Sequence, residues 1–498
     1  MTTNSNHINP FDKILGSATL AKPMVIILLI VVTALVALIL SKIEIVGVVL
    51  LLVLFFGSIF FYILFKNPII GFYTAIGLNF VILGSTRYVK TGFPIGFLMD
   101  GIIIVAFLAL IFSRFRERVD WSPANKHVTI LAIIWLGYFI LQLVNPEARS
   151  IEAWIAGRST GFHFLFFVVI TLMFINTNKK LDTFLYIWGA FSILVSLKGI
   201  GQLIFGVDSA EQAWLNDGAA QTHLLFGKLR IFSFLTDAGN FGANQGYSAV
   251  VAIIYSMTKK GLPKIFFISV GILGLYGMVI SGTRGAIAVP FAGFMTFFVL
   301  KKNIKVLSFG VLAVVLIFVF FKFTMIANGN AQIRRMRTGF DPNNPSLQVR
   351  KENQKILKGY LASRPFGGGV GHGGDKAQRF LPHAFLSHVS TDSWYVMIWA
   401  EMGIIGLVLH LCILFYVIGM ASFKVMFRIR DPITKLKMSA LISGMAGIMV
   451  ASYGNEILGQ MPTSLLIYAT MAIISNQEIF EVSIEEEELK LITDNKIS

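Results

Sequence analysis

The chain has 498 residues, of which 55% are hydrophobic, 13% are aromatic and only 14% are charged. Because soluble domains carry about 25% charged residues, this composition excludes an ordinary soluble protein and indicates an integral membrane protein. The formal charge of +16 would suggest a nucleic-acid partner in a soluble protein. Here most basic residues stand in short loops between apolar segments, where they set membrane topology, so we expect no nucleic-acid partner. The single cysteine, Cys412, excludes an intrachain disulfide.

Apolar runs long enough to cross a bilayer, about 20 residues each, predict an all-α polytopic fold with about 12–14 transmembrane helices. Fourteen such runs begin near Met24, Ile45, Ile69, Ile95, Val128, Phe162, Leu181, Phe241, Ile265, Ala286, Val306, Ser393, Met438 and Pro462. No internal repeat and no second soluble domain interrupt them. We therefore expect residues 1–498 to form a single membrane domain.

The charges of the loops predict how these helices are oriented. If the N-terminus is cytoplasmic, the basic loops at 114–126, 259–264 and 424–437 also face the cytoplasm, as the positive-inside rule requires. Both termini are then cytoplasmic. The acidic tail, residues 477–498, carries "EEEE" and is expected to be solvated and to take no part in chemistry.

Two segments on the predicted outer side are longer than the others, residues 207–240 and 327–391. The second is strongly basic, and loops of this length escape the positive-inside rule. Within it, "NNPSLQVRKENQKILKGYLA" predicts an amphipathic helix with Asn344 as N-cap and Pro345 in the first turn. Its predicted apolar face comprises Val349, Ile356, Leu357 and Tyr360. We expect residues 327–391 to form a functional external loop.

Several charged and polar residues fall on the same predicted outer side. Arg284, in "VISGTRGAIAVPF", stands between two long apolar runs, where an arginine in lipid would cost several kcal/mol. It is therefore either an anchor at the membrane edge or part of a polar cavity. The other candidates on this side are Arg230, Arg350, His372, His383, His388 and Asp392. Each alone can be an interfacial or solvated side chain, and their convergence on one face favours a site.

The residue types on this face indicate which ligand it takes. Arginine presents a rigid fork of donors that matches phosphate geometry, so several arginines suggest a phosphate or pyrophosphate, which in so lipophilic a chain is lipid-linked. The three histidines have irregular spacing and no acidic partner three or four residues away, which predicts no metal site. There is no serine nucleophile elbow, and no cofactor is expected.

Four motifs resemble the O-antigen ligase and O-antigen polymerase (Wzy-like) superfamily. They are "LRIFSFLTDAGNFG", "SGTRGA" (Ser281–Ala286), "RPFGGGVG" (Arg364–Gly371) and "DSWYVMIWAEMGIIGL" (Asp392–Leu407). The resemblance covers Leu229 to Leu407. It implies a GT-C-like membrane fold with a large periplasmic loop, here residues 327–391, in the inner membrane of a bacterium.

The resemblance also implies an activity. Members are glycosyltransferases of cell-surface polysaccharide synthesis that use no metal, invert the anomeric centre, and move a glycan from a polyprenyl (undecaprenyl) pyrophosphate to a sugar hydroxyl. The acceptor can be a growing O-antigen or exopolysaccharide, or the core of lipopolysaccharide; a polymerase could also bind a chain-length regulator protein. Arg230 and Arg284 match the family arginines that hold the pyrophosphate, with Arg284 in a catalytic role. Arg350, His372 and His383 are further substrate-binding candidates.

The residue that accepts the proton departs from the family pattern. The family has a histidine about eleven residues before the first glycine of an E-x-G-x-x-G motif; here Glu401, Gly403 and Gly406 fit, but the histidine position is Asp392. Asp392 can be a helix N-cap, for which aspartate is well suited. Alternatively it is catalytic, either as the base itself or as the partner that orients His388.

Two other classes of function share some of these features. A transporter or flippase of lipid-linked oligosaccharide would also have many helices and a basic cavity, but paired halves are expected in such proteins and none is found in this sequence. A scaffold of an envelope-assembly complex would leave the outer arginines unexplained. The long external loop with its candidate bases favours an enzyme.

Overall fold

The computed structural model describes Ile27, Val31 and residues 51–52, 54–89, 94–112, 119–225, 227–329, 331–341 and 345–481. The chain divides into two units, Met1–Pro68 and Ile69–Ser498. The first contains an apolar helix, Leu54–Lys66. The span expected near Met24, most of the one expected near Ile45, the N-cap Asn344 and residues 482–498 of the tail lie outside the described residues.

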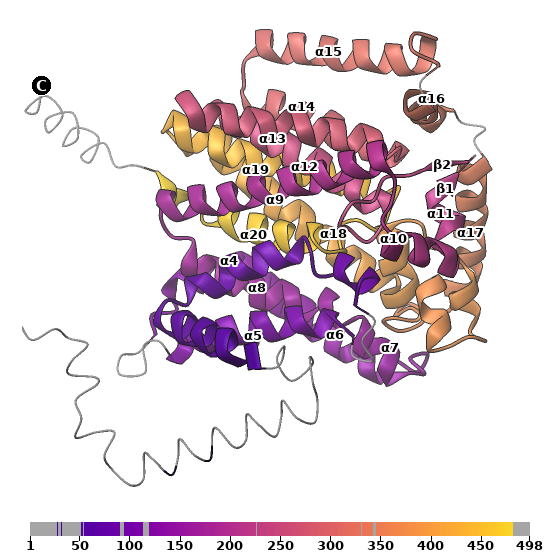
Figure 1. Ribbon diagram of the computed structural model, residues 1–498, viewed down its shortest axis with the longest axis horizontal. Coiled ribbons are helices and arrows are strands. Elements are labelled where there is room, and N and C mark those ends of the chain that lie inside the picture. Colours follow the sequence, from indigo (N-terminus) through magenta and orange to yellow (C-terminus); the bar gives the residue numbers. More distant parts are fainter. Residues whose placement is uncertain are drawn as a thin grey trace, which may run out of the picture. The chain divides into compact units, whose positions relative to one another are not determined.

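The second unit is built from helices with one small β-hairpin (Figure 1). Its apolar helices are α4 (Ile69–Asn79), α5 (Gly96–Phe112), α6 (His127–Leu141), α8 (Phe162–Phe174), α9 (Asn178–Phe205), α12 (Ala238–Ser256), α13 (Gly261–Ile280), α14 (Ala288–Leu300), α15 (Ile304–Phe323), α18 (Trp394–Phe427), α19 (Pro432–Ala451) and α20 (Thr463–Ser475). The elements between them are α7 (Ile151–Ala156), α10 (Ser209–Trp214), α11 (Ala220–His223), β1 (Leu224–Leu225), β2 (Lys228–Leu229), α16 (Ala331–Arg337), α17 (Pro345–Leu361) and the short helical turns η1 (Gly84–Arg87), η2 (Ser122–Ala124), η3 (Gln142–Val144), η4 (Arg158–Thr160), η5 (Leu215–Ala219), η6 (Arg284–Ile287), η7 (Thr338–Phe340), η8 (Asp375–Arg379), η9 (Phe385–His388) and η10 (Gln477–Phe480).

These helices confirm the all-α polytopic membrane fold. Among the described residues, five helical segments are long and apolar enough to cross a bilayer: His127–Val144, Asn178–Phe205, Gly261–Ile280, Trp394–Phe427 and Pro432–Ala451. Shorter apolar helices accompany them. Each of the twelve apolar runs expected from Ile69 onward contains one helix of the second unit.

Helix α12 is the centre of the second unit. It packs against α13, α14 and α19, and α14 also packs against α19. Small residues allow this close approach: a Cβ added to Gly274 of α13 would lie 2.8 Å from the carbonyl oxygen of Gln245 in α12. Asp237 caps the helix by accepting from the backbone N–H of Asn240 at 2.9 Å. The start of α12 is thereby a fixed platform beside which the loops can assemble.

The two long loops expected from the sequence gather near the end of the bundle where α12 begins (Figure 1). The first contains α10, α11 and the antiparallel hairpin of β1 and β2, in which Leu224 faces Leu229. The second contains α16, α17 and the turns that precede α18.

The amphipathic helix predicted in the second loop is present as α17, and its apolar face is the predicted one in part, because Leu357 and Tyr360 pack inward. Leu357 and Leu361 are buried, whereas Val349 and Ile356 are exposed. The buried face packs against Leu386, Val389, Val396 and Ala400. The helix is therefore rotated toward α18 and the turn that precedes it, because those residues supply the apolar surface that it covers.

Candidate functional site

A cavity of about 630 Å³ lies where the loops meet the membrane helices. Four arginines and two aspartates are among its lining residues, so positive charge is in excess. These residues come from distant parts of the sequence, and we call this space the arginine cavity. Its charged lining residues are Arg230, Arg284, Arg335, Asp341, Arg350 and Asp392.

Arg230 directly follows the β-hairpin, and its side chain is held by two segments, one before the hairpin and one before η6. Its guanidinium donates to the carbonyl oxygen of Thr222 at 3.0 Å and to Oγ1 of Thr283 at 3.1 Å. Thr283 in turn donates to the carbonyl oxygen of Ala238, at the start of α12, at 2.8 Å. The orientation of Arg230 is thus fixed against the platform formed by α12 and η6.

Arg87 braces the same loop from behind. This buried arginine of η1 donates to the carbonyl oxygens of Ser233, Leu235 and Thr236, which lie between Arg230 and the cap of α12. Its guanidinium also lies 4.4 Å from the ring centroids of both Trp214 and Phe232, within the range of cation–π attraction.

Arg284 begins η6, directly after α13 ends at a tight turn. It donates to Oγ1 of Thr338 at 3.1 Å, and a Cβ added to Gly339 would lie 3.2 Å from the Cβ of Arg284. The segment α16–η7 therefore covers Arg284 closely. Arg335 of this segment also lines the cavity, and burial, followed by repulsion from Arg230 and Arg284, lowers its pKa to about 10.

Asp392 also lines the arginine cavity and forms an ion pair with Arg350 of α17, with 3.7 Å between Oδ2 and Nε. The interpretation of Asp392 as a helix N-cap is wrong. The N-cap of α18 is Ser393, and Asp392 stands before it with a φ of 47°. A left-handed backbone is uncommon for a residue with a side chain, although aspartate tolerates it better than most. With this backbone conformation Asp392 does not continue helix α18, and its carboxylate lines the cavity.

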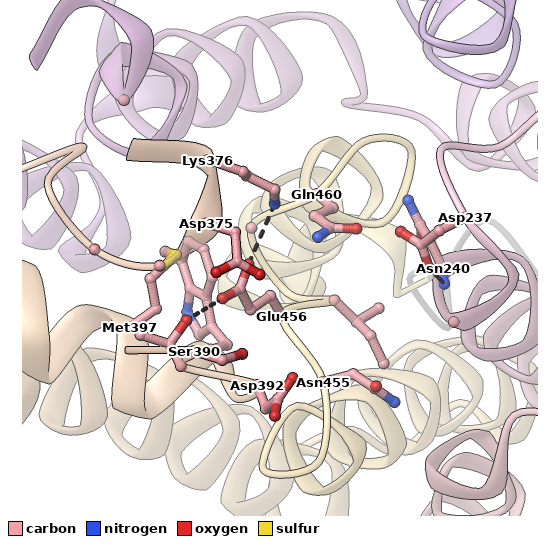
Figure 2. Close-up of a pocket in the computed structure, with 18 of the residues that line it drawn as sticks. Asp237, Asn240, Asp375, Lys376, Ser390, Asp392, Met397, Asn455, Glu456 and Gln460 are labelled. Atoms are coloured by element: carbon pink, nitrogen blue, oxygen red, sulfur yellow. Dashed lines mark hydrogen bonds and ion pairs between the residues drawn. The ribbon is translucent and has the colours of Figure 1, made fainter. Parts of the chain in front are cut away.

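A second cavity, of about 470 Å³, adjoins the first and shares Arg230, Asp392 and Asn455 with it. Carboxyl groups outnumber cationic groups in its lining, so we call it the carboxylate cavity. Its carboxyl groups belong to Asp237, Asp375, Asp392, Glu401 and Glu456. Figure 2 shows Asp392, Asn455 and Glu456 lying close together, with Lys376 bound to Glu456.

The glycine run and the E-x-G-x-x-G motif form one structural unit, which contributes Gly371 and Glu401 to the lining of the carboxylate cavity. Helix α18 is interrupted at Gly403, which has a φ of 70°, and the loop after Arg364 enters the break. The N–H groups of Gly368 and Gly369 donate to the carbonyl oxygens of Ala400 and Glu401, at 2.9 Å each. A Cβ on Gly403 would overlap the carbonyl group of Pro365. The glycines are needed so that the two backbones can touch.

His372 belongs to this unit and lines neither cavity. Its Nδ1 lies 2.9 Å from the carbonyl oxygen of Val370, and its Nε2 accepts from the N–H of Arg149 at 2.9 Å. Burial lowers the pKa of His372, which keeps the ring neutral and able to accept. Its observed role is to join the glycine loop to the segment before α7.

The structure does not bring the other two histidines into the cavities. His383 and His388 are both exposed, and neither is a lining residue. The Nε2 of His388 lies 2.7 Å from the carbonyl oxygen of Pro382, so this nitrogen donates its proton to the loop. His388 therefore faces its own turn, whereas Arg230, Arg284, Arg350 and Asp392 do converge.

Among the lining residues that sequence reasoning missed are Arg335, Asn455 and Glu456. Arg335 was one of several arginines in a basic loop, and its neighbour Arg334 is exposed, so spacing alone could not separate them. Asn455 and Glu456 lie in "SYGNEILGQ", a polar stretch between two apolar helices. This is the signal that singled out Arg284, and it could have identified them too.

A family model described as O-antigen ligase matches residues 269–411. This segment contains Arg284, Arg335, Arg350 and Asp392, together with the glycine run. Residues 269–411 are therefore similar to an O-antigen ligase domain. The match supports the O-antigen ligase and polymerase superfamily for the chain, and no curated protein matches it.

This similarity and the membrane helices together support a multi-pass membrane enzyme of O-antigen or related polysaccharide assembly. The matched segment contributes three of the four cavity arginines. Other lining residues lie outside it. Arg230 stands in the segment before α12, and Asn455 and Glu456 stand in the segment that follows α19. Within the described ranges, no three His, Cys, Asp or Glu side chains are grouped as metal ligands.

Proposed function

We propose that the protein is a glycosyltransferase that moves a glycan from a polyprenyl pyrophosphate to a sugar hydroxyl at the periplasmic face of the bacterial inner membrane. The observation that carries this proposal is the convergence of four arginines with one carboxylate, Asp392, at the meeting point of two cavities. The arginine cavity would hold the pyrophosphate, and the polyprenyl chain would extend into the bilayer.

The proposed reaction uses the arginines to stabilise the leaving group. The acceptor hydroxyl attacks the anomeric carbon from the face opposite the C1–O bond, which inverts the configuration. As that bond breaks, its electron pair goes to the pyrophosphate, whose negative charge grows. Preorganised guanidinium groups of Arg230, Arg284 and Arg335 stabilise that charge more in the transition state than in the ground state. No metal ion is part of the proposed mechanism.

Asp392 is the proposed proton acceptor. A general base must come within hydrogen-bond reach of the attacking hydroxyl, and Asp392 lines both cavities, so it borders the donor and the acceptor alike. The exposed position of His388, with its Nε2 bound to Pro382, gives no support to a relay through that histidine. The proton therefore passes from the hydroxyl directly to the carboxylate in this proposal.

The geometry serves a polymerase and a ligase equally well. As a polymerase the protein would extend O-antigen or exopolysaccharide repeats and could work with a chain-length regulator protein. As a ligase it would transfer an undecaprenyl-linked glycan to the core of lipopolysaccharide.

Lysine variants of the arginines test the function. Arg284→Lys and Arg230→Lys keep the charge but lose the fork of donors, so we expect at least a tenfold loss of transfer with normal accumulation in the membrane. The matched control is Arg334→Lys on α16, because this arginine is exposed. Wild-type glycan length in both lysine variants would reduce Arg230 and Arg284 to membrane anchors.

A deletion strain separates the enzyme from a flippase. Loss of a periplasmic transferase should leave undecaprenyl-linked units facing the periplasm, where an impermeant enzyme or label reaches them. Loss of a flippase would leave them facing the cytoplasm. Protection of the accumulated units from an impermeant probe would contradict our proposal.

The proposed orientation places both termini in the cytoplasm and residues 327–391 outside. Single cysteines are introduced at Asn328, Gln378 and Lys302 after the native Cys412 is replaced by serine. In intact spheroplasts, an impermeant maleimide should label the first two and spare Lys302→Cys. Labelling of Lys302→Cys alone would reverse the orientation and move the proposed site to the cytoplasm.

A further inference from the structure

The two cavities differ in the hydrogen bonds that they can offer. The arginine cavity presents guanidinium groups, which only donate, and such a lining suits a phosphate, which only accepts. The carboxylate cavity is lined by five carboxyl groups and three cationic side chains, Arg230, Lys376 and Arg379. Lys376 is already paired with Glu456, at 3.2 Å. This lining is richer in acceptors, and it disfavours a phosphate.

A buried histidine adds an uncharged acceptor to the carboxylate cavity. The Nδ1 of His223 lies 2.8 Å from Oγ1 of Thr222 and 3.1 Å from the carbonyl oxygen of Ala219. The Thr222 hydroxyl itself donates to that carbonyl oxygen at 3.2 Å, so Oγ1 accepts from the ring and Nδ1 carries the proton. Nε2 then presents a lone pair; it is buried and has no hydrogen-bond partner among the described residues. Burial lowers the pKa of His223, so the ring is neutral at physiological pH.

Glu456 is a carboxylate of this lining that is held by two side chains. The hydroxyl of Thr391 donates to one of its oxygens, and Nζ of Lys376 lies 3.2 Å from the other. Two partners fix the orientation of the carboxylate, while its remaining lone pairs stay available to a ligand. Thr391 directly precedes Asp392 in the sequence. Its hydrogen bond to Glu456 therefore keeps the two carboxylates, Asp392 and Glu456, near each other.

Saccharide hydroxyl groups are the natural partners of such a surface. Each hydroxyl donates one hydrogen bond, and carboxylates accept stronger bonds than neutral groups do. A volume of about 470 Å³ lies within the range of small-ligand sites, and the shared residues Arg230, Asp392 and Asn455 connect it to the arginine cavity. A saccharide here would present a hydroxyl toward Asp392 and the bound donor.

We propose that the carboxylate cavity is the acceptor site, that it takes a saccharide end that is uncharged or carries an amine, and that Glu456 is its positioning residue. Acidic saccharide ends are excluded because their carboxylates would face those of the lining. This inference rests on the proposed transferase function, since an acceptor site requires a transfer reaction.

The test compares Glu456→Gln with the wild type in a purified transfer assay, using acceptor glycan extracted from the deletion strain. Losing a charged acceptor should raise the KM for the acceptor roughly tenfold or more, with a smaller change in kcat. Binding of inorganic pyrophosphate should be unchanged or tighter, because a negative charge near the donor is removed. The matched control is Glu352→Gln, whose carboxyl group is 64% exposed on α17.

The exclusion of acidic saccharide ends is tested with the same glycan after its primary hydroxyls have been oxidised to carboxylates. The wild type should use the oxidised acceptor at least about tenfold less well, and Glu456→Gln should reduce that discrimination. A variant with altered folding alone would not show this selective rescue. If Glu456→Gln is too unstable to purify, Thr391→Val removes one partner of the carboxylate and should raise the same KM by a smaller factor.

Several results would overturn the inference: an unchanged KM in Glu456→Gln, weaker pyrophosphate binding in that variant, or equal use of oxidised and native acceptor by the wild type. Failure of the transferase proposal itself has a different signature. In that event the wild-type protein would neither bind inorganic pyrophosphate nor transfer glycan.

Discussion

Two clusters of charged side chains lie at opposite ends of α12 and α19, and they differ in how their charges are balanced. At the end of α12, Asp182 accepts from Tyr255 at 2.5 Å, from Lys437 at 3.0 Å and from Lys259. Lys437 also donates to Oδ1 of Asn178 at 2.8 Å. Every charged group in this cluster therefore has an opposite charge or a polar partner beside it.

At the start of α12, the arginine cavity contains four arginines against two aspartates, and its ion pair between Arg350 and Asp392 is a long one, at 3.7 Å. Burial, and after it the neighbouring guanidinium groups, lower the pKa of Arg335. The comparison teaches that local balance marks a network that holds the fold, whereas an excess of one sign in a cavity marks a surface prepared for a ligand of the opposite sign.

The largest expected effect is the loss of transfer in Asp392→Asn. Asparagine tolerates a positive φ as well as aspartate does, so the backbone is preserved, but it cannot take a proton. We expect transfer to fall by about 10²–10⁴-fold, the usual contribution of a general base. Asp392→Gly separates conformation from chemistry, because glycine adopts this φ freely and should be equally inactive. Near-normal transfer in either variant would remove Asp392 from the mechanism.

The second prediction concerns how Arg335 affects the stability of the protein with and without pyrophosphate. Arg335→Gln removes one of several like charges, so it should stabilise the protein without ligand, whereas it should weaken binding of inorganic pyrophosphate. In the wild type, pyrophosphate at 100 times its Kd should add about 2.7 kcal/mol to the free energy of unfolding. Thermal unfolding in detergent, with and without pyrophosphate, measures both effects, and Arg334→Gln is the control. A variant that is less stable without ligand would show that Arg335 is a structural residue.

The third prediction concerns the cluster around Asp182, where a substitution should lower stability and leave transfer unchanged. Lys437→Met removes a buried cation, leaving Asp182 with Lys259 as its remaining charged partner. We expect a loss of about 1–3 kcal/mol in the free energy of unfolding, below the cost of stranding a buried charge completely. The transfer rate per folded molecule should stay the same. A selective loss of transfer at unchanged stability would mean that the cluster takes part in function.

The smallest expected effect is a pH dependence of stability that arises from His372. Its pKa is lowered from 6.5 by burial, so the unfolded chain binds more protons below that pH than the folded protein does. Its contribution is therefore fully present above pH 6.5 and is lost as the pH falls from 6.5 toward the folded pKa. Between pH 7.5 and pH 5.5, His372→Gln should lose less stability than the wild type, by about 1–2 °C in Tm. An identical pH profile in the two proteins would contradict this.

The parts of the site that were found from sequence were those with a local signature. Arg284 was visible because an arginine between two apolar runs is costly, and Asp392 because it stands where the family has a histidine. His383 and His388 looked equally promising in the sequence. The direction of a histidine ring in an irregular loop depends on which carbonyl groups lie nearby, and at His388 that group is Pro382.

Asn455 and Glu456 show the other limit of sequence reasoning. They are more than 60 positions from Asp392, and their place beside it follows from the antiparallel course of α18 and α19 and the contact of Trp394 with Ser452 and Asn455. Arg87 is more distant still, and nothing near it in the sequence shows that it braces the loop of Arg230.

The sequence by itself determined that this is an all-α membrane protein and which segments form its apolar helices, because hydropathy acts over short stretches of chain. It also singled out Arg230, Arg284 and Arg350 as candidates for one site. Only the tertiary structure decided which arginines share a cavity, that α18 breaks at Gly403 to receive the glycine run, and that a second, carboxylate-lined space adjoins the first. Those features depend on contacts between residues far apart in the chain, where packing and backbone hydrogen bonds outweigh local preference.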